Sequence, residues 1–249
     1  MNDRLLGIDV GGSSLKGGIV EVRSGRVLGE LLSMETPKPS TPSALVGAMK
    51  TLADRLPQAA GPIGIAFPSV IKHGVAHTAA NIDKGWIGTD GASLATRALG
   101  RPALFLNDAD AAGIAEMRWG AGRDCQGTAI MLTFGTGIGS ALFIEGKLFP
   151  NTELGHLELH GMDAEKWASA RVRTAERLDF PAWSARVNDY LLAVHKLFWP
   201  DLFILGGAVS ERFAEFAPLL KVPVELRRAQ FANQAGVIGA AMVAAELLE

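Results

Sequence analysis

Short apolar runs, each ending at turn-forming residues, predict three β-strands at the start of the chain. The strands lie at about residues 4–10, 14–22 and 26–34. Glycine, serine and charged residues bound these runs, which favours strands over a helix. A Pro- and Ser-rich turn follows, and Thr41 or Ser43 can cap a helix over about residues 43–56.

The rest of the chain continues to alternate between strand and helix patterns. Further strands are predicted at 63–67, 103–106, 127–134, 138–144 and 202–205, and helices at 111–119, 163–177, 182–199 and 234–248. Three antiparallel strands followed by helix and strand occur in each half, which predicts an α/β fold duplicated into two lobes. We expect residues 1–107, completed by the C-terminal helix within 234–249, to form a small lobe, and residues 108–233 a large one.

Two glycine-rich turns, each between β-like runs, are the strongest functional signal. The first is Asp9-Val10-Gly11-Gly12-Ser13-Ser14-Leu15-Lys16, and the second runs from Thr133 through Gly135-Thr136-Gly137 to Ser140. Glycines let backbone N–H groups approach an oxyanion closely. Neither turn matches the Walker loop or the dinucleotide loop. Many hairpins of this kind only reverse the direction of the chain, but the presence of two of them favours a pair of phosphate-binding loops.

Composition narrows the class of protein. The net charge of −2 argues against general binding to nucleic acid or to an anionic membrane. The single cysteine excludes a disulfide framework and favours a reducing compartment, with the cytoplasm as the default. No basic, apolar leader and no run of 18 uncharged apolar residues is present, so we expect neither secretion nor membrane spanning.

Five motifs in order resemble those of one family. They are D-x-G-G-S-S-x-K-G from Asp9, N-D-A-D-A-A from Asn107, G-T-G-I-G-S from Gly135, E-L-G-H from Glu153 and L-G-G-A-V-S from Leu205. Together they resemble the actin-like sugar kinases of the ROK family, most of all the subgroup that uses polyphosphate or ATP. The resemblance covers nearly the whole chain and implies an actin-like (ribonuclease H-like), duplicated, two-lobed sugar kinase fold.

Two departures from the family pattern bear on metal and DNA binding. Many members carry a cysteine-rich zinc loop after the E-x-G-H motif, whereas the stretch from Gly161 to Ser169 has no cysteine, so no zinc site is expected. The helix-turn-helix of the family's repressors is not expected either. His156, Glu158 and His160 alternate as metal ligands on one strand would, but an ordinary polar strand face has the same pattern.

The resemblance assigns Asp108 as the general base that takes the proton of the attacking sugar hydroxyl. Its position before a helix also suits an N-cap. The residues expected to bind the sugar come from several motifs: Ser69, Asn81, Asn107, Asp108, Glu153, His156 and Glu165. Carboxylates, amides and imidazole suit the paired hydroxyls of a hexose.

The phosphoryl donor is expected at the glycine turns. The resemblance implies that Asp9 holds Mg²⁺, through water, beside the donor's phosphates. The expected donor-binding residues are Asp9, Gly11, Gly12, Ser13, Lys16, Thr133, Gly135, Thr136, Gly137, Gly206 and Gly207. A long polyphosphate also needs a basic track, for which the candidates are Lys72 with Lys84, Arg171 and Arg173 with Arg177, and Arg227 with Arg228.

The predicted function is transfer of a phosphoryl group from polyphosphate or ATP to the 6-hydroxyl of glucose, with mannose as the next acceptor. The alternatives are an ATP-only kinase of a hexose or N-acetylhexosamine, and a sugar sensor without catalysis. The resemblance also implies a homodimer. The apolar face between Trp183 and Trp199 offers an interface for it, although a buried core stripe explains that face equally well.

Overall fold

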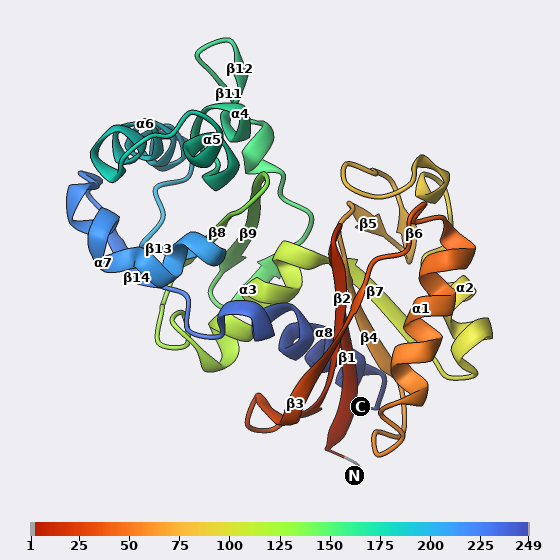
Figure 1. Cartoon of the computed structure of the whole chain (residues 1–249). Coiled ribbons are helices and arrows are strands. Elements are labelled where there is room, and N and C mark those ends of the chain that lie inside the picture. Colours follow the sequence, from red (N-terminus) through yellow and green to blue (C-terminus); the bar gives the residue numbers. More distant parts are fainter. Residues whose placement is uncertain (1–2, 249) are drawn as a thin grey trace. The chain divides into compact units, whose positions relative to one another are not determined.

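The computed structural model describes residues 3–248, so Met1, Asn2 and Glu249 of the predicted small lobe lie outside the described residues. The chain forms two compact units (Figure 1). Unit 1 takes the residues up to Ala115 and those from Gln234 onward, and unit 2 takes Glu116–Asn233. The chain therefore passes between the units twice, first within a helix and then just before the last helix.

Unit 1 is built on a five-stranded sheet in the order β3-β2-β1-β4-β7. The strands are β1 (Arg4–Val10), β2 (Ser14–Glu21), β3 (Arg26–Glu35), β4 (Ile63–Phe67) and β7 (Ala103–Asn107). The first three are antiparallel neighbours, whereas β4 runs parallel to β1 and β7 parallel to β4. Each of these strands was predicted from its apolar run.

Helices cover both faces of this sheet (Figure 1). On one face lie α1 (Pro42–Asp54) and α2 (Gly91–Leu99), and on the other α8 (Ala235–Ala245). Thr41 caps α1 by accepting from the Ala44 amide, as predicted. The prediction missed α2, although Asp90 caps it by accepting from Ser93 and Gly100 ends it in the left-handed region.

The last helix packs directly on the sheet because glycines replace larger side chains there. A Cβ on Gly7 of β1 would overlap the Val237 carbonyl, and one on Gly64 of β4 would overlap that of Ala240. The helix is buried almost all round, which explains why its sequence is alanine-rich and lacks a polar face. This packing joins the C-terminal segment to the first strands of the chain.

Short elements complete unit 1 beside the ends of β4 and β7. They are β5 (Ile71–Lys72), β6 (Val75–Ala76) and the 3-10 helix η1 (Lys84–Trp86). Trp86 is fully buried, lies 4.5 Å from Phe67 between ring centroids, and donates its indole N–H to the Ser40 carbonyl at 3.0 Å. These contacts fix the loop that carries Asn81.

Unit 2 has a second five-stranded sheet, in the order β10-β9-β8-β13-β14. Its strands are β8 (Thr128–Phe134), β9 (Ile138–Ile144), β10 (Lys147–Phe149), β13 (Leu202–Gly206) and β14 (Glu225–Arg228). The order mirrors that of unit 1: three antiparallel strands, then two parallel ones. The prediction of a duplicated strand pattern is confirmed, although β10 and β14 were not foreseen.

The helices of unit 2 are α4 (Ala164–Ala168), α5 (Ala170–Ala175), α6 (Phe180–Phe198) and α7 (Phe213–Phe216). The helical stretch predicted near 163–177 is present as two short helices, because Ser169 adopts an extended backbone and caps α5 by accepting from Val172. The remaining short elements are η2 (Leu154–His156), β11 (Glu158–Leu159), β12 (Met162–Asp163), η3 (Ala208–Arg212), η4 (Ala217–Leu219), η5 (Ala232–Gln234) and η6 (Glu246–Leu248).

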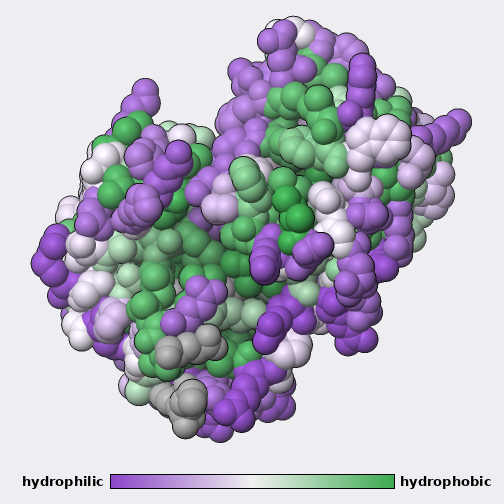
Figure 2. All heavy atoms as spheres, turned by 180° about the vertical axis from the view of Figure 1, so that it is seen from behind, coloured by the Kyte–Doolittle hydropathy of each residue, from purple (hydrophilic) through white to green (hydrophobic). Residues whose placement is uncertain are grey.

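The apolar face of α6 is mostly core. Trp183, Val187, Tyr190 and Val194 are fully buried. The exposed large apolar side chains of the segment are Leu192, Leu197 and Trp199, of which Trp199 keeps 75% of its surface accessible. Figure 2 shows a face on which hydrophilic and hydrophobic residues are mixed. None of the helices in the described part of the chain has the length and apolar character needed to cross a bilayer.

Candidate active site

The end of β7 brings three predicted site residues together in unit 1. The Asn107 side chain caps α3 (Asp108–Trp119), its Oδ1 accepting from the amides of Ala109 at 2.9 Å and Asp110 at 3.0 Å. Its Nδ2 donates to the Ser69 carbonyl at 3.2 Å. Asn107 therefore fixes both the start of α3 and the loop after β4, and Asp108 sits between them as the first residue of the helix.

Ser69 and Asp108 differ in how their side chains are used. Ser69 is buried, and its hydroxyl accepts from the Thr78 amide at 3.1 Å and donates to the Val70 carbonyl at 3.1 Å. Its side chain thus holds its own loop. Asp108 is partly buried, and its Oδ1 accepts from the Ala109 amide at 2.8 Å.

The first glycine turn joins β1 and β2, and an acidic and a basic residue flank it. Asp9 and Lys16 face each other across β1 and β2. Burial raises the pKa of the Asp9 carboxyl, and the nearby Lys16 ammonium partly opposes this. Thr36 holds the turn from outside, because its hydroxyl donates to the Gly11 carbonyl at 2.6 Å and its amide to that of Ser13 at 3.0 Å. No local sequence signal pointed to Thr36, since its partners lie more than 20 residues away.

Asn81 lies against this turn although it is far from it in the sequence. A Cβ placed on Gly12 would lie 3.1 Å from the Asn81 Cβ. Asn81 is exposed. In unit 1 the structure therefore places one predicted sugar ligand beside the predicted phosphate turn.

The second glycine turn lies at the tip of the β8–β9 hairpin in unit 2. The Gly135 amide donates to the Gly137 carbonyl at 3.0 Å, and the Gly135 carbonyl accepts from the Arg171 amide at 3.0 Å. The residues Gly206 and Gly207 after β13 lie close to the same hairpin, because a Cβ on Gly207 would overlap the Phe134 carbonyl. Thr133, Gly135, Thr136, Gly137, Gly206 and Gly207 are thus gathered at one end of the unit 2 sheet.

Glu165, a predicted sugar ligand, reaches this turn from the first residues of α4. Its Oε2 accepts from the Ile138 amide at 3.3 Å. A Cβ on Gly137 would overlap the same oxygen, so a side chain at this position would have to displace the carboxylate. On the other side of Ile138, a Cβ on Gly155 of the E-L-G-H motif would overlap the Ile138 carbonyl. The predicted sugar and phosphate elements of unit 2 therefore meet at Ile138.

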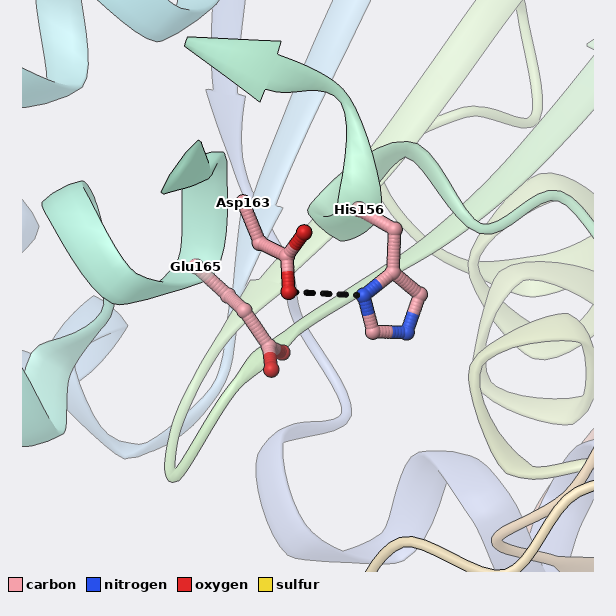
Figure 3. Close-up of side chains that lie close together, drawn as sticks. All are labelled: His156, Asp163 and Glu165. Carbon is pink, nitrogen blue, oxygen red and sulfur yellow. Dashed lines mark ion pairs between the residues drawn. The ribbon is translucent and has the colours of Figure 1, made fainter. Parts of the chain in front are cut away.

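Three possible metal ligands of unit 2 lie together (Figure 3). One ligand atom of each of His156, Asp163 and Glu165 lies within 4.8 Å of the others, and His156 Nδ1 is 3.6 Å from Asp163 Oδ2. Asp163 also pairs with Lys166 at 3.0 Å. The alternating strand pattern proposed for His156, Glu158 and His160 is absent, because His156 belongs to η2 and His160 lies in a turn with φ 54°.

Glu153 is electrostatically linked to this group. Burial raises the pKa of its carboxyl, His156 lowers it, and the charge of Glu165 raises it further. His156 Nε2 lies 3.7 Å from Glu153 Oε2. The predicted sugar ligands Glu153, His156 and Glu165 thus form one cluster. Asp163 also belongs to this cluster, although no sequence motif marked it.

The basic clusters proposed as a polyphosphate track differ in their partners. Arg227 is paired with Glu225 at 2.7 Å and donates to the Ala121 carbonyl at 2.8 Å. Arg173 stacks over the Phe180 ring, with its guanidinium carbon 4.1 Å from the centroid. Arg171 is exposed, and its backbone is bonded to Gly135 of the second glycine turn.

Known proteins resemble this chain in sequence over most of its length. The family model described as ROK family matches residues 5–170. The polyphosphate glucokinase of Mycobacterium tuberculosis (strain H37Rv) is 45% identical over 239 residues, which are 95% of this chain and 89% of that protein. The polyphosphate glucokinase of Mycobacterium leprae is 42% identical over 96% of this chain and 74% of its own.

Solved structures agree with these matches. The inorganic polyphosphate/ATP-glucomannokinase of Arthrobacter sp. strain KM has a TM-score of 0.95 and 46% identity, covering 99% of this chain and 100% of its own. The two mirrored units define an actin-like sugar kinase fold, as predicted. This chain belongs to the ROK family.

Proposed function

We propose that this protein is a glucokinase that transfers a phosphoryl group from inorganic polyphosphate or ATP to the 6-hydroxyl of glucose, with mannose as a second acceptor. The observation that carries this proposal is 45% identity with a polyphosphate glucokinase over 95% of the chain. The presence of Asp108, both glycine turns and the sugar-ligand cluster supports it. It is favoured over an ATP-only kinase and over a sugar sensor without catalysis.

In the proposed reaction the 6-hydroxyl oxygen forms a bond to phosphorus while the bond to the donor's bridging oxygen breaks. Asp108 accepts the hydroxyl proton, and the donor leaves as ADP or as a polyphosphate shorter by one unit. Asn107 positions Asp108, since it caps the helix that Asp108 begins. General-base catalysis of this kind contributes about 10²–10⁴-fold.

The residues proposed to bond to the sugar hydroxyls, as the family pattern implies, are Asn81, Asn107, Glu153, His156 and Glu165. Carboxylates accept from hydroxyls, and amides and imidazole both accept and donate. Ser69 acts indirectly in this proposal, because its carbonyl holds Asn107.

Within each unit, the backbone N–H groups of the glycine turn are the proposed contacts for the donor's phosphates, with Lys16 as a further contact at the first turn. Mg²⁺ prefers oxygen ligands and is usually held by one or two carboxylates, water and substrate phosphates. The Asp9 carboxylate fits this pattern, and the ion would neutralise charge that develops on the transferred phosphoryl group. The cluster of His156, Asp163 and Glu165 is assigned to the sugar rather than to a metal.

Of the three basic clusters, the one on α5 is the best candidate for the polyphosphate track. Arg171 is attached through its backbone to the second glycine turn, whereas Arg227 is already neutralised by Glu225. We expect Arg171→Gln to weaken polyphosphate use more than ATP use. Arg227→Gln is the matched control, and equal losses with both donors in Arg171→Gln would remove Arg171 from the track.

A homodimer and a cytoplasmic location complete the proposal. The exposed end of α6, where Trp199 and Leu197 lie open, is the candidate dimer surface. The single cysteine supports a reducing compartment. Light scattering of the purified protein, compared with a Trp199→Ser variant, tests the dimer.

A further inference from the structure

The Glu165 carboxylate of unit 2 contacts the second glycine turn, which is proposed to bind the donor. It also belongs to the cluster of side chains that is proposed to bind the sugar. Glu165 Oε2 accepts from the Ile138 amide at 3.3 Å, and a Cβ on Gly137 would overlap that oxygen. A ligand oxygen of Glu165 also lies within 4.8 Å of ligand atoms of His156 and Asp163 (Figure 3). The three heavy atoms nearest to that Cβ position all belong to the Glu165 carboxylate group.

This arrangement places a negative charge beside a turn that has to receive an anion. The Ile138 N–H group, which a phosphate oxygen would attract, is already bonded to Glu165. Burial raises the pKa of the neighbouring Glu153 carboxyl, and the charge of Glu165 adds to this shift, which shows that the two carboxyl groups lie near each other. A carboxylate beside an anion site disfavours the anion. Without sugar, the second glycine turn is therefore a weak donor site.

We propose that Glu165 couples the two substrates: it disfavours the donor while the sugar is absent and releases this inhibition when sugar hydroxyls bond to it. The inference rests on the proposed function, in which Glu165 contacts the sugar. Sugar hydroxyls that donate hydrogen bonds to the Glu165 carboxylate withdraw negative charge from it. They also hold the carboxylate close to the sugar and away from the Ile138 amide. Sugar binding thereby makes the Ile138 amide and the space beside Gly137 available to phosphate.

Such coupling has a use in a kinase. A donor bound without an acceptor can transfer its phosphoryl group to water, which wastes the donor. An electrostatic barrier that only the sugar removes suppresses this hydrolysis. By linkage, the donor must raise the affinity for the sugar by the same factor as the sugar raises that for the donor.

The test is donor affinity measured by calorimetry with and without 6-deoxyglucose, a sugar that lacks the reacting hydroxyl, in the presence of magnesium. The donor is ATP or a short polyphosphate, whichever supports turnover of the wild-type enzyme. We expect the sugar to tighten donor binding by about 5-fold or more in the wild type. In Glu165→Gln the sugar-free donor affinity should rise by about 3-fold or more, and hydrolysis without sugar should increase.

The matched control is Glu158→Gln, which removes an equal charge from an exposed position on β11. It should leave the sugar-free donor affinity within about 2-fold of the wild type. An unchanged or weaker sugar-free donor affinity in Glu165→Gln overturns the inference, and so does an equal gain in Glu158→Gln. Because donor affinity is measured without sugar, this test does not require that Glu165→Gln still binds sugar.

A pair of glycine variants tests the contact itself. A methyl group on Gly137 would displace Glu165, whereas one on Gly47 of α1, outside the proposed site, meets no atom within 4 Å. We expect Gly137→Ala to weaken 6-deoxyglucose binding by about 5-fold or more, and Gly47→Ala to leave it unchanged. Equal sugar affinities in the two variants contradict the inference. If the wild type phosphorylates no sugar, the proposed function itself fails, which is a distinct outcome.

Discussion

Asn107, and not its neighbour Asp108, bonds to the Asp110 amide and so caps α3. Both residue types suit an N-cap, and the sequence did not decide between them. Because Asn107 takes this position, Asp108 becomes the first residue of the helix, with a carboxylate that the cap does not require. The structural role of this motif therefore falls to Asn107, and the catalytic role that we propose falls to Asp108.

This division predicts the effect of Asp108→Asn. The variant should keep its fold and its affinity for glucose, because the cap remains, but its turnover should fall by about 10²-fold or more. Steady-state kinetics together with calorimetric glucose binding measure the two effects. Asp54→Asn, at an exposed position on α1, is the control. An Asp108→Asn enzyme that retains more than a tenth of the wild-type turnover would exclude Asp108 as the base.

Asn107→Ala should have a different signature. Losing a helix cap costs about 1–2 kcal/mol of unfolding free energy, and the Ser69 loop loses its bond to the Asn107 amide as well. Urea unfolding should therefore show reduced stability, and turnover should fall because Asp108 is no longer fixed. If Asn107→Ala is as stable as the wild type, the cap does not contribute to the free energy of unfolding.

Asp9→Asn should change the dependence of stability on pH. Burial raises the pKa of Asp9 in the folded protein above its ordinary value of 3.8. The wild type therefore loses stability as pH rises through the raised folded pKa, because the buried carboxyl must ionise. The variant should be more stable than the wild type at pH 7, and the difference should vanish below pH 3.8.

Thermal unfolding at both pH values tests this, and the same variant should lose activity if Asp9 holds Mg²⁺. A constant difference in stability between wild type and variant at the two pH values would contradict the assignment of the burial penalty to Asp9.

Tyr190→Phe should stabilise the protein. Tyr190 is fully buried, its hydroxyl has no hydrogen-bond partner among residues 3–248, and burial together with the charge of Glu165 raises the pKa of its phenol. Removing an unsatisfied buried hydroxyl without changing the ring should increase the free energy of unfolding by about 1 kcal/mol. Chemical denaturation measures it, and a loss of stability would mean that the hydroxyl has a partner in solution.

The strands and longer helices followed from the sequence because their signals are local. The apolar runs of β1, β4 and β8 are bounded by glycine or polar residues, and Thr41 marks the start of α1. The break at Ser169 was missed, since the residues around it favour helix on both sides. The edge strand β14 was missed because its alternation includes two arginines, of which Arg227 is anchored by a distant carbonyl.

The candidate site was predictable in its parts but not in its connections. Motifs identified Asn107, Asp108, Glu153 and Glu165, since each lies in a recognisable pattern. The bond from Ile138 to Glu165 joins residues 27 positions apart, and no local pattern reveals it. Pairings of this kind are set by the packing of a 3-10 turn and a short helix against a strand, which composition and periodicity do not specify.

The most direct test of the account is glucose 6-phosphate formation by the purified protein with magnesium, with nucleotide-free polyphosphate and ATP compared at matched phosphoryl concentration. The account predicts product from polyphosphate, and from ATP as well. Product from ATP alone would contradict the polyphosphate assignment and remove the basis for a track at Arg171. No product from either donor would contradict the kinase function itself.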